Sequence, residues 1–286
     1  MVSIALIQTS CTKDPDRNLN RTLELIEQAV TEGNRIICLQ ELFTTTYFCR
    51  NISQSFFKWA EPIPGRVTDH LTRMAARHEV VILAPFFERQ AAGLYYNSMV
   101  VVDADGSLLG TYRKMHIPDD PGFYEKYYFT PGDQGYQVYK TAYGKIGTLI
   151  CWDQWYPEAA RITAMKGADL LVYPTAIATL PGENEQDKKE YLQAWQTIQR
   201  SHAIANGCFV ASINRVGEEG GSKFWGHSFV AGPFGQIIAE AGETEIILSA
   251  EMDYSKIEEQ RQNWPFFRDR RIESYDPILK RWLPDD

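Results

Sequence analysis

The segment over residues 145–157 places a cysteine directly after an apolar run that predicts a buried strand. Residues 146–150 form that strand, Cys151 follows it, and Pro157 stands near the start of the next predicted helix. A side chain at this place can face a crevice, and the N–H groups of the following turn are free to stabilise an oxyanion. Acyl-transfer nucleophiles are presented in this way, although a lone cysteine beside a tryptophan is more often a core residue.

The order of the predicted elements indicates an α/β fold. Residues 2–8 are predicted to form a buried strand, residues 19–31 an amphipathic helix and residues 35–40 a second strand, which together make a βαβ unit. Strand-turn-strand hairpins follow, and residues 217–223 are predicted to be a flexible loop. The pattern therefore favours a layered α/β sandwich. Further helices are predicted over residues 65–78, 158–166, 191–206 and 255–262.

The chain is long enough for one large core. It has 286 residues, of which 44% are hydrophobic, so we predict a single domain over residues 1–286. Residues 264–286 form a tail whose stretch over residues 266–282 is basic and aromatic and has no evident place in a sandwich core. Such a tail packs either on another subunit or over its own.

Charge and cysteine usage exclude several classes of function. The net charge of −8 argues against a nucleic-acid partner. The five cysteines are scattered without a C-x-x-C pair, which argues against a zinc site or a disulfide framework. No segment has the pattern of a signal peptide or the apolar length needed to span a bilayer. We therefore expect a cytoplasmic protein with reduced thiols, no metal, no cofactor and no membrane partner.

Two more polar residues follow predicted core strands. Glu41 comes directly after the strand over residues 35–40, and Lys114 follows the strand over residues 107–112. Each alone would be an ordinary solvated charge. Because sites gather at strand ends, these two residues and Cys151 can meet in one crevice. There a carboxylate can take the thiol proton, an ammonium can stabilise an oxyanion, and the thiolate can attack a carbonyl carbon.

Three motifs in order carry a resemblance to the nitrilase superfamily of carbon–nitrogen hydrolases. They are residues 39–43 (LQELF), 112–117 (YRKMHI) and 146–153 (IGTLICWD). The resemblance extends over essentially the whole chain. It implies a four-layer αββα sandwich that assembles as a homodimer or a higher homo-oligomer, so we expect the tail over residues 264–286 to pack on a neighbouring subunit.

The resemblance also implies roles for five residues. Glu41 is expected to be the general base, Lys114 an oxyanion donor and Cys151 the nucleophile. The backbone N–H of Trp152 would be a second oxyanion donor. Glu125 matches the family's second glutamate, which orients the lysine and helps to handle protons.

Within the superfamily, the chain most resembles the N-carbamoylputrescine amidohydrolases. The matching stretches are residues 41–49, 118–133 and 151–161. The reaction implied is hydrolysis of N-carbamoylputrescine to putrescine, carbon dioxide and ammonia, a step of polyamine biosynthesis. The expected partner is therefore a small cationic carbamoyl amine.

The residues after the nucleophile favour a cationic substrate. Relatives that bind carbamoyl amino acids resemble one another in placing arginine or histidine there, whereas this chain has Gln154 and Trp155. A butyl-ammonium tail needs an apolar wall with an acid at its end. We expect the wall to comprise Tyr47, Trp152 and Trp155. The acid is expected among Glu183, Glu185, Asp187 and Asp120, with Glu183 preferred.

Other functions stay open at this point. The same three-residue chemistry could act on an ω-amide or on another N-carbamoyl amine. A nitrile substrate suits a polar, acid-rich pocket poorly, and a binding protein without activity would be expected to have lost Cys151 or Lys114.

Overall fold

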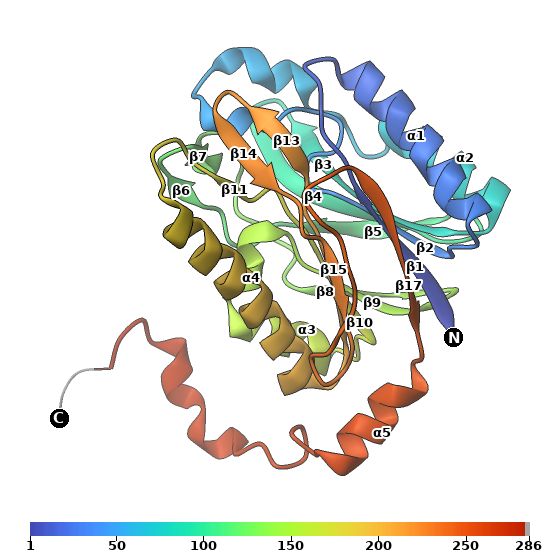
Figure 1. Cartoon of the computed structure of the whole chain (residues 1–286), viewed down its shortest axis with the longest axis vertical. Coiled ribbons are helices and arrows are strands. Elements are labelled where there is room, and N and C mark those ends of the chain that lie inside the picture. Colours follow the sequence, from blue (N-terminus) through green and yellow to red (C-terminus); the bar gives the residue numbers. More distant parts are fainter. Residues whose placement is uncertain (284–286) are drawn as a thin grey trace.

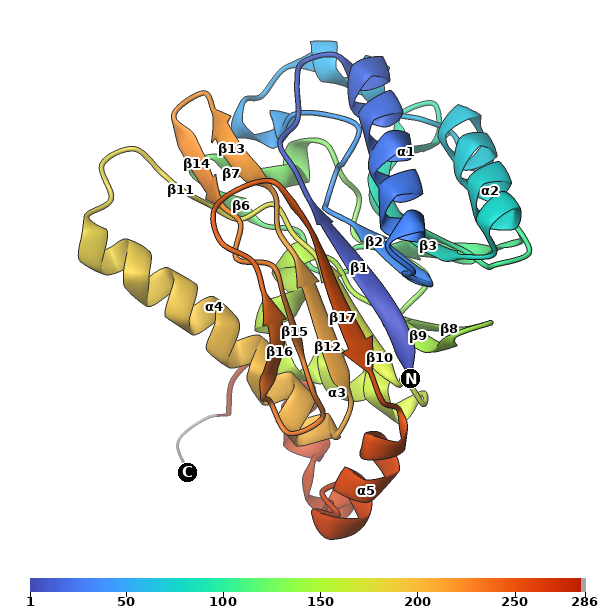
Figure 2. The same ribbon diagram turned by 45° about the vertical axis from the view of Figure 1, so that its right-hand side comes forward.

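The computed structural model describes residues 1–283, and its core is a pair of six-stranded sheets (Figures 1 and 2). In the first sheet the neighbouring strands β1, β2 and β3 run parallel, and the other strands pair antiparallel. Its strands in spatial order are β17 (Ile246–Met252), β1 (Val2–Gln8), β2 (Ile36–Leu39), β3 (Val81–Ala91), β4 (Leu94–Val102) and β5 (Leu108–Arg113).

The second sheet repeats this plan. Its strands β9, β10 and β12 run parallel, and antiparallel strands flank them on both sides. In spatial order the strands are β16 (Ile237–Glu240), β15 (Phe229–Ala231), β12 (Phe209–Ile213), β10 (Leu170–Pro174), β9 (Gly144–Thr148) and β8 (Gln137–Thr141).

Helices cover the outer face of each sheet. In Figure 1, α1 (Pro15–Thr31) and α2 (Arg66–His78) lie over the first sheet, and α3 (Pro157–Met165) and α4 (Glu185–Asn206) lie over the second. Strand β1 shows how one strand serves two layers, because alternate side chains point to opposite faces. Ile4 and Leu6 belong to the cluster that contains residues of both sheets, and Ala5 and Ile7 to the cluster with α1 and α2. The predicted four-layer αββα sandwich is therefore confirmed.

Shorter elements surround the end of the sandwich where the predicted site residues lie. Strands β6 (Asp119–Asp120) and β7 (Phe123–Tyr124) form a hairpin, and β11 (Ala178–Thr179), β14 (Ser222–Trp225) and β13 (Val216–Glu219) form a small sheet. The remaining helical elements are α5 (Ser255–Asn263) and the short 3₁₀ helices η1 (Phe48–Arg50), η2 (Gln54–Trp59), η3 (Glu125–Tyr127), η4 (Cys151–Trp155), η5 (Ile272–Ser274) and η6 (Asp276–Leu279).

Local capping explains where two helices differ from the sequence prediction. Helix α1 begins at Pro15, four residues earlier than predicted, because the Asp14 carboxylate accepts the N–H groups of Asp16 and Arg17. Helix α4 begins at Glu185, six residues earlier than predicted, because Asn184 caps it in the same way. The predicted flexible loop over residues 217–223 is wrong, since β13 and β14 pair there as a hairpin.

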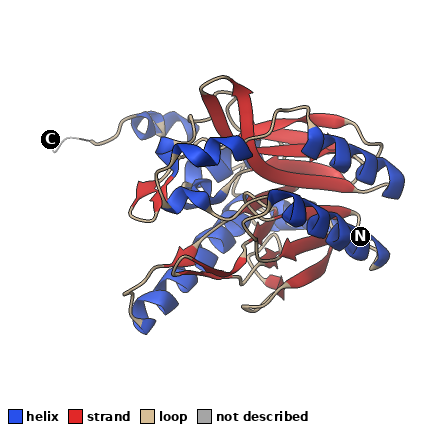
Figure 3. Cartoon of the chain, turned by 90° about the horizontal axis from the view of Figure 1, so that it is seen from above, coloured by secondary structure: helices blue, strands red, loops and turns tan. Residues whose placement is uncertain are grey.

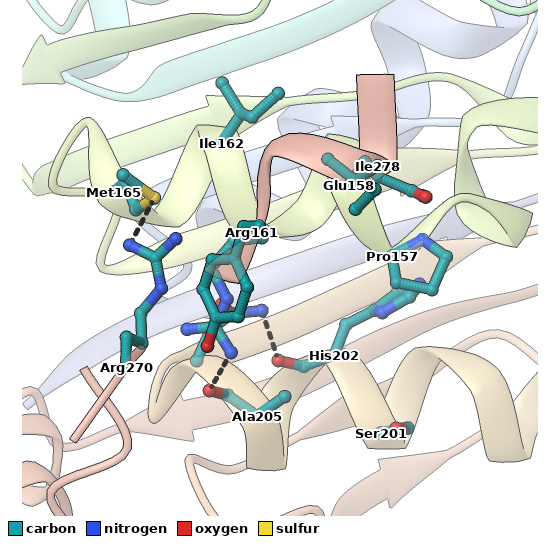
Figure 4. Close-up of a pocket in the computed structure, with 12 residues that line it drawn as sticks. Pro157, Glu158, Arg161, Ile162, Met165, Ser201, His202, Ala205, Arg270 and Ile278 are labelled. Atoms are coloured by element: carbon teal, nitrogen blue, oxygen red, sulfur yellow. Dashed lines mark hydrogen bonds between the residues drawn. The ribbon is translucent and has the colours of Figure 1, made fainter. Parts of the chain in front are cut away.

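The C-terminal tail leaves the sandwich after α5 and runs past the outer helices (Figures 1 and 3). Its residues Arg270, Tyr275 and Ile278 form a cavity of about 490 Å³ with α3 and α4, shown in Figure 4. Ile272, Leu279 and Trp282 are 68%, 87% and 81% exposed. The last three residues of the predicted tail, 284–286, lie outside the described residues. No helix in the described range is both long and apolar enough to cross a membrane.

Candidate active site

The four residues predicted to carry the chemistry meet in one buried cluster. Glu41 follows β2, Lys114 directly follows β5, Cys151 begins η4 just beyond β9, and Glu125 begins η3. Glu41 and Glu125 are fully buried, Lys114 is 1% exposed and Cys151 is 6% exposed. The fold thus brings together residues as far apart in the sequence as Glu41 and Cys151, which are separated by 110 positions.

Lys114 lies between two carboxylates. Its Nζ donates to Oε1 of Glu41 at 2.9 Å and to Oε2 of Glu125 at 2.7 Å. Burial opposes the ammonium charge, but the charges of Glu125 and Glu41 outweigh burial and hold the pKa of Lys114 well above its usual value. The lysine therefore stays an ammonium and can stabilise negative charge that develops on a bound substrate.

Glu41 bonds described residues through one of its two carboxylate oxygens. Besides the bond from Lys114, Oε1 accepts Nδ2 of Asn97 at 2.7 Å, whereas the buried Oε2 has no partner among the described residues. This oxygen is thus available to accept a proton, as a general base must be. Sequence reasoning missed Asn97, although an asparagine in the apolar run of β4 was a usable signal.

Glu125 is held by a tyrosine on its other oxygen. The Tyr47 hydroxyl donates to Oε1 of Glu125 at 2.7 Å. Burial and the charge of Glu41, opposed by Lys114, raise the pKa of Glu125 to about 7. Tyr47 was predicted to form the wall of the substrate pocket, but its ring packs between Phe123 and Phe224 and it does not line the cavity described below. Tyr47 therefore holds the Glu125 carboxylate through its hydroxyl and does not form the wall of the cavity.

Cys151 lies at a strained turn. Its φ of 43° is left-handed, which is uncommon for a residue with a side chain and typical of a nucleophile elbow. Burial and the charge of Glu41 raise the pKa of the Cys151 thiol well above its usual value, while Lys114 and the Ala176 N–H act in the opposite direction. The resting group is therefore a thiol, and its proton must leave as the sulfur attacks. Because η4 begins at Cys151, the Trp152 N–H belongs to a first turn that lacks intrahelical acceptors.

Asp153 ties the cysteine turn to the segment after Lys114. It is fully buried, and its Oδ2 accepts the Ile150 N–H at 2.9 Å and the Tyr112 hydroxyl at 2.7 Å. Its Oδ1 accepts the His116 N–H at 3.0 Å and contacts His116 Nδ1 at 2.7 Å. One carboxylate thus fixes the turn that carries the nucleophile to residues on both sides of Lys114.

A mostly apolar cavity of about 520 Å³ lies over Cys151. Trp152 and Trp155 line it as predicted, with ring centroids 6.5 Å apart. Asp120 and Glu125 are its two acids, and no lysine, arginine or histidine is found among the described residues that line it. The other lining residues are Pro118, Pro121, Phe123, Gln154, Ala176, Ile177, Ala178, Leu180, Tyr191, Ala194 and Trp225.

Of the four acids among which a cation-binding residue was expected, Asp120 is the one that lines the cavity. Oε2 of Glu183 accepts the Leu180 N–H at 2.8 Å within its own loop, and Glu183 is not part of the cavity lining. Glu185 and Asp187 lie in the first turn of α4 and do not line the cavity either. The sequence placed all four acids near the site, and only the fold of the β6–β7 hairpin shows which one reaches it.

The described residues contain no group of three histidine, cysteine, aspartate or glutamate side chains that could hold a metal ion. The arrangement itself offers a thiol, a carboxylate whose charge acts on that thiol and whose second oxygen has no partner among the described residues, an ammonium and an apolar cavity. Those groups together can perform nucleophilic acyl transfer followed by hydrolysis.

Comparison with known proteins agrees with this chemistry. Residues 3–262 match the family model for carbon-nitrogen hydrolases, and the chain belongs to that family. It is 43% identical to an N-carbamoylputrescine amidase of Solanum lycopersicum over 98% of this chain and 95% of the relative. It is also 40% identical to a citrullinase of Francisella tularensis over 98% of this chain and 99% of the relative.

A solved structure has nearly the same fold. The crystal structure of a carbon-nitrogen hydrolase from Helicobacter pylori G27 superposes with a TM-score of 0.96, and the two sequences are 46% identical. The match covers 99% of each chain. The overall architecture is thus shared with a solved carbon-nitrogen hydrolase over nearly the whole of both chains.

Proposed function

We propose that this protein is a thiol amidohydrolase that converts N-carbamoylputrescine and water to putrescine, carbon dioxide and ammonia. The observation that carries this proposal is the lining of the cavity over Cys151, which offers aromatic and aliphatic surface, two acids and, within the described residues, no basic side chain. Such a cavity suits a linear chain with a positive end and disfavours a carboxylate. The identity to an N-carbamoylputrescine amidase supports the same substrate.

The first half of the reaction forms a carbamoyl thioester. The Cys151 thiol passes its proton to the free Oε2 of Glu41 as the sulfur attacks the ureido carbon. The carbonyl oxygen becomes an oxyanion, which the Lys114 ammonium and the Trp152 N–H stabilise. The carbon–nitrogen bond then breaks, and the departing nitrogen takes the proton that Glu41 holds.

The second half restores the thiol. Glu41 takes a proton from water, the resulting hydroxide adds to the thioester carbon, and the sulfur departs and regains a proton. The carbamic acid that leaves decomposes to carbon dioxide and the second nitrogen product, so the two halves together release putrescine, ammonia and carbon dioxide. Glu125 stays hydrogen-bonded to Lys114 through both halves and, with Glu41, holds the ammonium in position.

We also infer that the enzyme acts in the cytoplasm, in polyamine biosynthesis, as a homodimer or a higher homo-oligomer. All five cysteines are free thiols, which suits a reducing compartment. The exposed apolar residues of the tail, Ile272, Leu279 and Trp282, support a subunit contact there, because covering them would remove apolar surface from water.

The direct test is ammonia release by the purified protein from N-carbamoylputrescine, N-carbamoyl-β-alanine and glutamine under matched conditions. We expect strong preference for N-carbamoylputrescine, because the other two bring a carboxylate into a cavity without a basic lining residue. Activity only on one of the other two would keep the thiol chemistry and refute the proposed substrate.

Asp120 is the acid that we propose for the substrate ammonium, with the Trp152 and Trp155 rings beside the butyl chain. Asp120 lines the cavity and is exposed, so solvent screens its charge. An exposed ion pair contributes up to about 1 kcal/mol, so Asp120→Asn should raise KM for N-carbamoylputrescine by up to roughly fivefold. The kcat should stay unchanged, because the acid is remote from the reacting carbon.

Glu183→Gln is the matched control variant, because Glu183 does not line the cavity and its carboxylate accepts the Leu180 N–H. We expect it to leave KM unchanged. If Glu183→Gln raises KM and Asp120→Asn does not, the acid predicted from the sequence is the correct one and the assignment from the cavity is refuted.

A further inference from the structure

A buried arginine holds the loop that carries Glu41. Arg215 follows β12 and is fully buried. Its Nη2 donates to the carbonyl oxygens of Glu41 and Leu42 at 3.0 Å each and of Thr45 at 3.1 Å. Its Nη1 donates to Oε1 of Glu219 on β13 at 2.9 Å.

Glu219 binds the other end of the same loop, at Tyr47. Its Oε2 accepts the Tyr47 N–H at 2.6 Å, so the arginine and the glutamate together contact the loop from residue 41 to residue 47. The loop needs such support, because Leu42 adopts a left-handed φ of 51°. In Figures 1 and 2 the β13–β14 hairpin lies beside the segment that follows β2.

Both ends of this loop lead to a carboxylate that binds Lys114. Glu41 is the first residue of the loop and bonds Nζ directly. Tyr47 is the last, and its hydroxyl bonds Glu125, which bonds Nζ from the other side. We propose that Arg215 and Glu219 form a positioning pair that sets the geometry of both carboxylates around Lys114.

The choice of arginine matches this task. The two terminal nitrogens of the guanidinium contact different groups: three carbonyl oxygens share the two hydrogens of Nη2, and Nη1 donates to Glu219. A lysine ammonium would have to reach both the loop and the carboxylate from one atom. Burying this charge is costly, and a buried ion pair is weak support for stability alone. Positioning of the catalytic carboxylates therefore explains the buried Arg215–Glu219 pair better than a contribution to the free energy of unfolding does.

The test compares Arg215→Lys and Glu219→Gln with the wild-type enzyme on whichever amide the wild type hydrolyses fastest. The inference rests on the Glu41, Lys114 and Cys151 chemistry and not on the identity of the substrate, so a different preferred substrate would leave it testable. Glu219→Gln breaks one contact, because both partners of this side chain are donors and an amide has one acceptor oxygen. Glu218→Gln is the control, since Glu218 is the exposed neighbour on β13.

We expect both variants to lower kcat roughly 10- to 100-fold, the effect of a small misplacement of catalytic groups, with KM changed less than about threefold. The acid limb of the kcat/KM profile should also move to higher pH, because Glu125 loses support from Tyr47. Circular dichroism and thermal melting establish folding, and Glu219→Gln carries the test if Arg215→Lys fails to fold. Folded variants with wild-type kcat and pH profile, even with lower melting temperatures, would overturn the proposal.

Discussion

Tyr47→Phe removes one hydroxyl from the site and should shift its pH dependence. The Tyr47 hydroxyl donates to Glu125 at 2.7 Å, both groups are buried, and this bond lowers the pKa of Glu125, which burial holds at about 7. A hydrogen bond to a charged group contributes about 1.5–3 kcal/mol, and about 1.4 kcal/mol corresponds to one pKa unit. Without the hydroxyl, the pKa of Glu125 should therefore rise by roughly one to two units.

The assay is a profile of kcat/KM between pH 5.5 and pH 9.5. If ionised Glu125 is needed to hold Lys114, the wild-type acid limb lies near pH 7, and the limb of Tyr47→Phe moves up by the same one to two units. At pH 7 the variant should be roughly 5- to 50-fold slower, and near pH 9.5 it should approach wild type within about twofold. Tyr127→Phe, which removes an exposed hydroxyl from the same segment, is the control. A Tyr47→Phe profile with an unmoved acid limb would refute the role of Tyr47.

Three further changes have definite expected outcomes. Cys151→Ala should abolish hydrolysis and preserve the melting temperature, and measurable turnover would exclude the thiol mechanism. The folded-state pKa of Glu125, about 7, lies above its ordinary value of 4.5, so the folded state binds this proton more tightly and its contribution to the free energy of unfolding falls as pH rises through that window. Urea titrations at pH 5 and pH 8 should therefore show a smaller pH difference for Glu125→Gln than for wild type. Deleting residues 264–286 should reduce the oligomer mass seen by light scattering, because it removes Leu279 and Trp282, and an unchanged mass would place the contact elsewhere.

The sandwich and its central residues could be predicted because strong local signals mark them. Apolar runs predicted the core strands, and Glu41, Lys114 and Cys151 each follow such a run. Sites gather at strand ends, so three polar residues that each follow a core strand were expected to meet, although Glu41 and Lys114 follow strands of one sheet and Cys151 follows a strand of the other. The role of Tyr47, in contrast, depended on the path of its loop, which carries no periodic pattern.

The remaining parts of the site depend on contacts between distant segments. Arg215 lies 174 positions from Glu41, and nothing in the sequence around it shows that its guanidinium binds the loop after β2. Glu183 is preferred to Asp120 from the sequence alone, and the β6–β7 hairpin, in which Asp120 is the last residue of β6, brings Asp120 to the cavity. Helix starts moved by several residues because single caps, such as Asn184, override weak helical periodicity.

The most direct test of the proposed function compares three ureas of equal chain length that differ only at the far end. N-carbamoylputrescine carries an ammonium there, N-pentylurea a methyl group and 5-(carbamoylamino)pentanoate a carboxylate. Because the described lining of the cavity holds two acids and no basic side chain, we predict that kcat/KM falls in that order. A carboxylate substrate that is hydrolysed as well as or better than N-carbamoylputrescine would contradict the assignment.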